Sequence, residues 1–259
     1  MKFKQSLGQN ILHNKHTLKF IIDHLNLSGN EAVLEIGGGT GKLTEYIVKN
    51  NNYTRLKIVE IDQRFLGILN EIVQDYENSE IINEDILQYP VDFSDKIVVA
   101  GNIPYYITKP IIKHLSKYKD NIIKAVLMVQ NEVAKSFTAK PGDKKYTAFT
   151  VFLKNIGKIK YLKKVSKGDF IPQPKVDSAL IEIKFNDIKK LFRSEEFDDF
   201  IFNSFRHRRK TLYNNLKNYY DREKIKKTLK DLNIKTNIRA EKLTLKDFKN
   251  LYKKLQKKN

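Results

Sequence analysis

The stretch Ala32-Val-Leu-Glu-Ile-Gly-Gly-Gly-Thr-Gly41 decides the fold of this chain. Residues 32–36 form a short, mostly apolar run, which predicts a buried strand. The glycines that follow permit positive φ angles and a close approach of the backbone to a ligand. Residues 43–48 then show the apolar spacing of a helix. A strand, a glycine-rich turn and a helix in this order are typical of the first unit of a parallel α/β sheet.

The same alternation of strands and helices continues to about residue 185. Further strands are predicted at 56–61, 80–82, 96–100, 125–129 and 178–185, further helices at 65–75 and 110–115, and either element at 146–152. Continuous apolar runs such as 96–100 are typical of strands covered on both faces. After residue 185 only helices are predicted, at 197–205, 210–219, 222–232 and 245–255. We therefore predict a doubly wound α/β domain over 1–185 and a small all-α domain over 186–259.

Composition narrows the class of protein. The 259 residues are 41% hydrophobic and contain no cysteine, which excludes disulfides and thiolate chemistry. No run reaches the roughly 18 apolar residues of a membrane span, and residues 1–10 do not resemble a signal peptide. We therefore expect a cytoplasmic protein without a membrane partner.

The net charge favours a polyanionic partner. The chain has 49 Lys and Arg against 30 Asp and Glu, a formal charge of +19. From Asn186 onward there are 22 basic and 10 acidic residues, so this part carries +12 and the first 185 residues carry +7. A lysine-rich solvated surface would also explain the total positive charge. The concentration of that charge in the C-terminal part favours RNA contact there.

The glycine turn resembles the first motif of the class I S-adenosylmethionine methyltransferases. Gly37, Gly39 and Gly41 give the pattern G-x-G-x-G, whereas Lys42 stands where a dinucleotide fingerprint needs its third glycine. Glu60 follows the second strand about twenty residues later, where a carboxylate can accept hydrogen bonds from both ribose hydroxyls of an adenosyl group. Asp85 follows the third strand and can accept from the adenine amine. A tight packing turn with solvated carboxylates would account for each feature taken alone.

The residues Gly101-Asn-Ile-Pro-Tyr-Tyr106, after the fourth strand, are suited to methylating an exocyclic amine. The lone pair of an adenine amine is conjugated into the ring, so the nitrogen is a poor nucleophile. Two acceptors out of the ring plane, the Asn102 side-chain oxygen and the Ile103 carbonyl, would favour a pyramidal nitrogen. Pro104 stiffens the turn, and Tyr105 offers a face for stacking an extruded base. An ordinary strand-to-helix turn is the alternative explanation.

Together these motifs resemble the ribosomal RNA adenine N6,N6-dimethyltransferase family over nearly the whole chain. Gln5-Ser-Leu-Gly-Gln-Asn-Ile-Leu12 is similar to the family's G-Q-N-F-L segment, which folds over the cofactor, and Gly38 stands where the family has Pro. The resemblance implies a Rossmann-like class I methyltransferase domain with a mostly parallel seven-stranded sheet. It also implies S-adenosyl-L-methionine as the cofactor, bound by Asn10, Leu12, Gly37, Gly39, Glu60, Asp85, Ile86 and Asn102.

Two later motifs resemble the KsgA-type, small-subunit branch of the family. In Asp169-Phe-Ile-Pro-Gln-Pro-Lys-Val-Asp-Ser-Ala179, the resemblance implies that Phe170 sandwiches the target base against Tyr105. Phe205-Arg-His-Arg-Arg-Lys-Thr-Leu-Tyr-Asn-Asn-Leu216 is similar to a run that the large-subunit enzymes generally lack. Its cations can meet phosphates at a helix start, and the residues we predict to bind RNA are Arg206, Arg208, Arg209 and Lys210.

The resemblance implies dimethylation of two adjacent adenosines in a 3′-terminal hairpin of small-subunit (16S-type) rRNA, with a role in subunit biogenesis. The expected partner is the 30S-type subunit or its precursor. Alternatives are the same chemistry on large-subunit rRNA, a non-catalytic nucleic-acid binder on this fold, and a small-molecule methyltransferase. The five histidines form no ligand-spaced cluster, so we expect no metal, and we expect a monomer.

Overall fold

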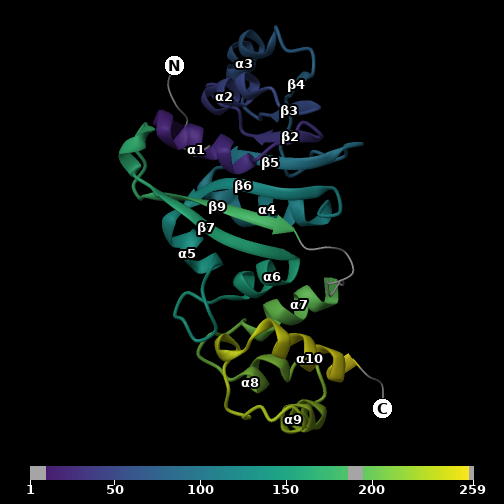
Figure 1. Cartoon of the computed structure of the whole chain (residues 1–259). Helices are drawn as coiled ribbons and strands as arrows, with labels where there is room; N and C mark the ends of the chain where they lie inside the picture. The colour runs from purple at the N-terminus through teal and green to yellow at the C-terminus, as the bar shows by residue number, and fades with distance from the viewer. Residues whose placement is uncertain (1–9, 186–194, 257–259) are drawn as a thin grey trace. The chain divides into compact units, whose positions relative to one another are not determined.

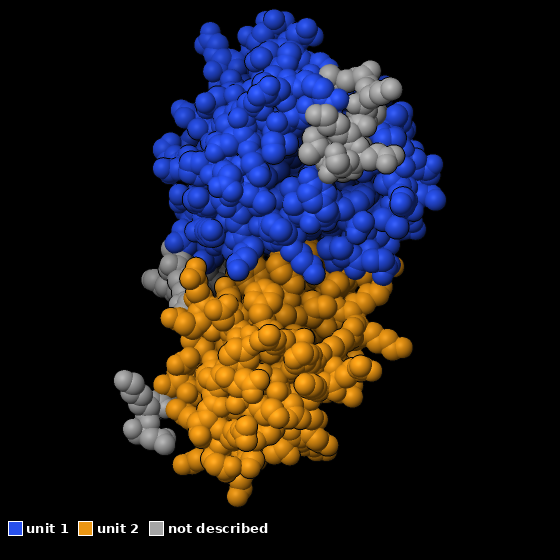
Figure 2. Space-filling view, turned by 180° about the vertical axis from the view of Figure 1, so that it is seen from behind, with its two compact units in different colours: residues 1–134, 158–185 blue, residues 135–157, 186–259 orange. Residues whose placement is uncertain are grey.

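A computed structural model of the chain describes residues 10–185 and 195–256 (Figure 1). Contacts between residues divide the chain into two compact units, each with its own interior (Figure 2). Unit 1 contains residues 1–134 and 158–185, and unit 2 contains residues 135–157 and 186–259. Each unit is described separately below.

Unit 1 is built on a seven-stranded sheet whose strand order is β4-β3-β2-β5-β6-β9-β7 (Figure 1). The pairs β2–β3, β2–β5, β3–β4 and β5–β6 are parallel, while β6–β9 is antiparallel. This arrangement confirms the predicted mostly parallel, Rossmann-like sheet. The strands are β2 (Glu31–Ile36), β3 (Arg55–Val59), β4 (Ser79–Ile82), β5 (Lys96–Asn102), β6 (Ile122–Gln130), β7 (Gly157–Val165) and β9 (Ser178–Phe185).

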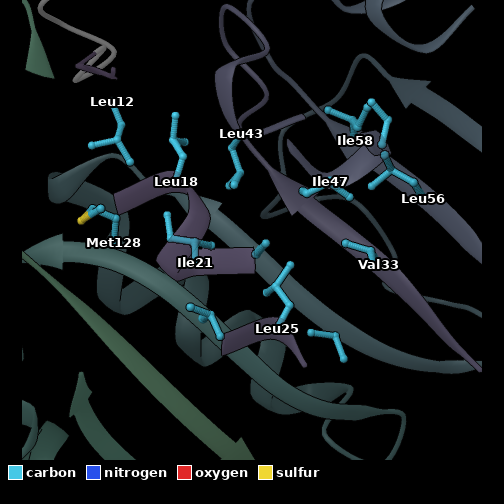
Figure 3. Packing of buried hydrophobic residues seen from close by; sticks show 14 of the residues in the cluster. Leu12, Leu18, Ile21, Leu25, Val33, Leu43, Ile47, Leu56, Ile58 and Met128 are labelled. Carbon is cyan, nitrogen blue, oxygen red and sulfur yellow. The ribbon is translucent and has the colours of Figure 1, made fainter. Parts of the chain in front are cut away.

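Apolar side chains cover both faces of this sheet. On one face Val33, Val98 and Met128 share a buried cluster with residues of the first three helices, where leucine and isoleucine side chains interdigitate (Figure 3). Leu34 and Val99, which alternate with them, are also fully buried, as continuous apolar strands require. The helices along this part of the chain are α1 (Lys15–Leu25), α2 (Lys42–Asn50), α3 (Leu66–Val73), α4 (Thr108–Lys117) and α5 (Asn131–Phe137).

Several elements of unit 1 were not predicted from the sequence, among them α1 and β7. The helix α1 contributes Leu18, Ile21 and Leu25 to the buried cluster, and its N-cap Asn14 accepts a hydrogen bond from the amide of Thr17. The strand β7 is a lysine-rich strand at the end of the sheet order. Lysines are common on edge strands because they discourage pairing with other chains, and they obscure the apolar alternation that signals a strand.

A second, two-stranded sheet brings the N-terminal arm to a loop far along the chain. The strand β1 (Ile11–Leu12) pairs antiparallel with β8 (Phe170–Ile171), so that Leu12 lies opposite Phe170. The side chain of Asn14 donates to a carboxylate oxygen of Asp169 at 3.0 Å. Residues 10–14 are therefore held by residues 169–171. Residues 5–9 of the predicted N-terminal motif lie outside the described residues.

Unit 2 is helical in the residues that the structure describes. Its interior is aromatic, with Phe197, Phe200, Phe248 and Tyr252 in one cluster and the Phe197 and Tyr252 ring centroids 5.2 Å apart. The helices are α6 (Ala148–Ile156), α7 (Glu195–Ser204), α8 (Leu212–Leu216), α9 (Arg222–Asp231) and α10 (Leu245–Gln256). The ambiguous segment 146–152 thus begins the helix α6.

The observed division of the chain differs from the predicted domains in one respect. Residues 135–157 belong to unit 2 and not to the α/β unit. Tyr146 is 1% exposed, and its hydroxyl donates to the carbonyl of Leu243 at 3.0 Å. Val151 joins the same buried cluster. The segment lies between two strands in sequence, so its apolar pattern alone does not reveal which core it completes.

The glycine turn joins β2 to α2 and is tightly packed on one side. Gly37, Gly39 and Gly41 all have positive φ angles, and Gly41 caps α2 at φ 76°. A Cβ on Gly38 would lie 2.8 Å from Ile58 and 2.9 Å from Leu69, both of which are fully buried. These side chains occupy the space that a Cβ would need, so the packing around the turn suits glycine at this position.

We predict opposite effects for two glycine-to-alanine changes. Gly38→Ala would crowd Ile58 and Leu69 and should lower the free energy of unfolding by about 1–3 kcal/mol. Gly67→Ala adds a methyl group in open space at an exposed position of α3 and should raise that free energy by about 0.5–1 kcal/mol. Urea unfolding measures both. Equal effects of the two changes would show that the turn is not tightly packed.

Candidate active site

A pocket opens where β2, β3 and β5 end, at one edge of the sheet in unit 1. Ligands bind at such an edge in open α/β sheets because the strand ends and the loops after them converge there. Every residue predicted to bind the cofactor lines this pocket, namely Asn10, Leu12, Gly37, Gly39, Glu60, Asp85, Ile86 and Asn102. The strand-end motifs, together with the family resemblance for Asn10, Leu12 and Ile86, therefore predicted residues that the fold brings together.

Glu60 ties the glycine turn to the end of β3. One carboxylate oxygen accepts from the amide of Gly39 at 2.9 Å, and the other accepts from the amide of Asp62 at 2.8 Å. The side chain is 6% exposed, and burial raises the pKa of Glu60 although both amides oppose the shift. Each oxygen retains a second lone pair, so the carboxylate can also accept from ligand hydroxyls.

The rest of the pocket lining combines polar and apolar groups. Asp85 accepts from the amide of Leu87 at 2.9 Å, which shapes the loop after β4, and Ile86 is buried beside it. Ile61 lines the pocket yet is 55% exposed, which is unusual for isoleucine. Sequence reasoning missed Ile61, although its position directly after Glu60 was a usable signal. An exposed apolar side chain next to two carboxylates is suited to covering an aromatic ring.

Glu35 lies behind the glycine turn rather than in the pocket lining. Its carboxylate is 0% exposed, and one oxygen accepts from the hydroxyl of Thr44 at 2.8 Å. The other oxygen has no hydrogen-bond partner among the described residues. Burial, with a smaller contribution from the charge of Glu60, raises the pKa of Glu35 to about 8. The group is therefore protonated in the folded protein at neutral pH.

Asn102, the last residue of β5, has its side-chain amide oriented by the N-terminal arm. Its Nδ2 donates to the main-chain carbonyl of Asn10 at 2.7 Å. Its Oδ1 makes no hydrogen bond within the described part of the chain. Because the nitrogen is engaged by the arm, the amide presents its oxygen as a free acceptor at the pocket, as the predicted role requires.

The aromatic side chains near Asn102 have different environments. Tyr105 is half-buried, and its hydroxyl lies 2.5 Å from the hydroxyl of Ser178. Phe170 is 2% exposed and packs in the core cluster, so in this conformation its ring is not open to a base. Pro104 and Tyr106 line the pocket, and Tyr106 is 61% exposed. The predicted sandwich between Tyr105 and Phe170 thus requires Phe170 to leave the core.

The predicted RNA-binding run in unit 2 divides into paired and unpaired cations. Arg206 donates to the hydroxyl of Tyr219, and Arg208 donates to the carbonyl of Lys144 and to the carboxylate of Glu241. The side chains of Arg209 and Lys210 are exposed and make no hydrogen bond or ion pair within residues 10–185 and 195–256. Arg208 therefore supports unit 2 internally, while these two cations remain accessible.

Comparison with known proteins accounts for this combination of pocket and motifs. The family model "Ribosomal RNA adenine dimethylase" matches residues 1–257. The chain belongs to this family. Two relatives named "Ribosomal RNA small subunit methyltransferase A" come from Mycoplasma mobile and Ligilactobacillus salivarius. They are 39% and 38% identical to the chain, over 98% and 97% of its length and 98% and 89% of their own.

Solved structures agree with this membership. A dimethyladenosine transferase from Plasmodium falciparum has a TM-score of 0.84 and 27% identity, covering 94% of this chain and 98% of its own. The 23S rRNA methyltransferase ErmE, with a TM-score of 0.75, 23% identity and coverage of 96% of this chain and 100% of its own, shares the fold. The family predicted from the sequence is confirmed, and so is the class of enzyme, an rRNA adenine dimethyltransferase.

Two searches of the described residues concern other kinds of site. No helix among them has the length and apolar character needed to cross a membrane. Within the same residues, no group of three or more His, Asp or Glu side chains is arranged to hold a metal ion. The expectation that the enzyme uses no metal stays a prediction.

We predict that Glu35 makes stability depend on pH. Between its ordinary value of 4.5 and about 8, the folded protein retains a proton that the unfolded chain has released. The free energy of unfolding therefore falls as pH rises through this window, by up to about 1.4 kcal/mol per pH unit. In Glu35→Gln this loss should be absent, so the free energy of unfolding of the variant should rise relative to that of the wild type from pH 5 to 8. Urea unfolding at several pH values measures this, and parallel curves would contradict it.

Proposed function

We propose that this chain transfers methyl groups from S-adenosyl-L-methionine to the N6 amines of two adjacent adenosines in small-subunit rRNA. The target would be a 3′-terminal hairpin, in the 30S-type subunit or its precursor. The observation that carries the proposal is Asn102, which presents a free amide oxygen at a pocket shared with the cofactor-type carboxylates. In this proposal unit 1 binds the cofactor and unit 2 contacts RNA.

The pocket residues fit S-adenosylmethionine. A Cβ on Gly37 would meet nothing within 4 Å, so this side of the turn is open to a ligand approaching the backbone. Glu60 would accept from the ribose hydroxyls and Asp85 from the adenine amine, while Ile61 would cover the adenine ring. Asn10 and Leu12 would close the pocket from the arm. When bound, the cofactor supplies an electrophilic methyl group on a sulfonium.

The role of the chain is then to position the amine. Asn102 Oδ1 and the Ile103 carbonyl would each accept one hydrogen of the adenine N6 amine, which turns its lone pair out of the ring plane. The bond from Asn102 Nδ2 to Asn10 prevents the amide from presenting its nitrogen instead. Alignment of the amine for in-line attack supplies most of the acceleration. The methylated nitrogen is acidic enough to lose its extra proton to water, so no strong base is needed.

Two observations support the small-subunit substrate over large-subunit rRNA. The run from Phe205 to Leu216 is present in full, and it places Arg209 and Lys210 on the surface of unit 2. The Mycoplasma mobile relative, at 39% identity over 98% of both chains, is named a small-subunit enzyme. The expected cytoplasmic location and monomeric state stay predictions.

The proposal is tested by transfer of labelled methyl from S-adenosylmethionine to small-subunit particles that lack this modification, with large subunits assayed alongside. Dimethyladenosine in small-subunit rRNA is the expected product. Label confined to large-subunit rRNA would show that large-subunit rRNA is the substrate instead. Label in neither, together with intact cofactor binding, would favour a binding or assembly role.

We predict that Asn102→Ala separates chemistry from cofactor binding. Loss of the amide removes one of the two acceptors, so the rate of methyl transfer should fall by at least about 100-fold. The affinity for S-adenosylmethionine should fall only modestly because Glu60 and Asp85 remain. Single-turnover transfer and calorimetric titration measure the two quantities. A near-normal rate would contradict the two-acceptor account.

We predict that cations of the basic run contribute unequally to RNA binding. Replacing both Arg209 and Lys210 by alanine should reduce the slope of log affinity against log salt by about one unit for each phosphate that is no longer neutralised. Arg208→Ala should chiefly lower the free energy of unfolding, since it leaves the carboxylate of Glu241 unpaired. Lys226→Ala, a control outside the run, should leave the slope nearly unchanged. An unaltered slope in the double variant would show that the run is structural.

A further inference from the structure

Ser178 is a buried hydroxyl that the mechanism above does not use. It is 0% exposed and begins β9, where it pairs with Gln130 of β6. Its hydroxyl oxygen lies 2.5 Å from the hydroxyl oxygen of Tyr105, the third residue after Asn102. A serine so far along the chain thus contacts the one tyrosine proposed to stack the base.

The position of Ser178 is fixed by its neighbours. The carbonyl of the preceding Asp177 accepts from the amide of Asn131 at 3.0 Å, and its carboxylate pairs with Lys164 at 2.7 Å. A carboxylate oxygen of Asp177 also accepts from the amide of Lys167 at 3.0 Å. The start of β9 is therefore held by three groups, which fix the main chain that carries the Ser178 hydroxyl and make it an anchor point.

The Tyr105 side chain depends on this anchor. Tyr105 begins η3 (Tyr105–Ile107), the single 3₁₀ turn between β5 and α4. The hydroxyl of Thr108 donates to its carbonyl at 3.1 Å, which fixes the main chain but not the ring. Within the described residues, Ser178 is the hydrogen-bond partner of the phenol oxygen. A ring that rotates freely would offer a stacked base no constant orientation.

We propose that Ser178 is a positioning residue for methyl transfer, because its hydroxyl holds the Tyr105 ring at the angle at which an adenine stacks beside Asn102. This inference rests on the proposed function. Ser178 contacts neither the pocket nor the bases itself, and it acts only through Tyr105. Removal of the Ser178 hydroxyl should slow turnover while cofactor binding, for which Glu60 and Asp85 remain, stays unchanged.

The test is a double-mutant cycle with Ser178→Ala and Tyr105→Phe, which remove the same hydrogen bond from either side. Each single variant should lower kcat for small-subunit methylation by about three- to tenfold, the effect of one hydrogen bond. The double variant should lose no more than either single variant, since the hydrogen bond is already broken. Ser178→Thr, which keeps the hydroxyl, should retain most of the wild-type kcat.

Cofactor affinity and thermal unfolding of each variant show whether the fold is intact. If Ser178→Ala fails to fold, the kcat of Tyr105→Phe, which lacks the hydrogen bond, can still be compared with that of Ser178→Thr, which keeps the hydroxyl. Multiplicative losses in the double variant, a wild-type kcat in Ser178→Ala, or a loss confined to cofactor affinity would each overturn the proposal. A wild-type protein that methylates neither subunit would instead overturn the proposed function, and with it the role given to Ser178.

Discussion

The pocket depends on the carboxylate of Glu60, which accepts hydrogen bonds from the amides of Gly39 and Asp62. This group ties the glycine turn after β2 to the end of β3, so the ends of two parallel strands become one surface. The tie is possible because the strands are parallel and their carboxyl ends meet at one edge. Burial of the carboxylate strengthens the hydrogen bonds, since little water competes for its oxygens.

Hydrogen bonds from distant segments of the chain hold residues of the loop after β5. The Asn102 amide is oriented by the carbonyl of Asn10, 92 residues away in sequence. The Tyr105 hydroxyl is held by Ser178, 73 residues away. The arm itself is fixed by pairing of β1 with β8 and by the bond from Asn14 to Asp169. A poor nucleophile is activated by precise positioning of acceptors, and positioning requires groups that cannot rotate.

Unit 2 shows the same division between supporting and available groups. Arg208 joins the loop at Lys144 to Glu241, while Arg209 and Lys210 stay exposed. Tyr146, from a segment that interrupts the α/β unit in sequence, completes the aromatic interior of the helical unit. The basic run therefore has a structural residue in its middle, and its charge alone does not show how many of its cations are free of internal contacts.

The sequence by itself predicted most strands of the α/β unit, and the resemblance of its motifs implied the family and the cofactor residues that line the pocket. The strands, the glycine turn and the acids at the strand ends are visible in local patterns, because each is formed by a few neighbouring residues. Only the tertiary structure decided that Phe170 is buried, that residues 135–157 join unit 2, and that Ser178 reaches Tyr105. Each of these depends on contacts between residues far apart in sequence, and such contacts leave no periodic signal in the chain.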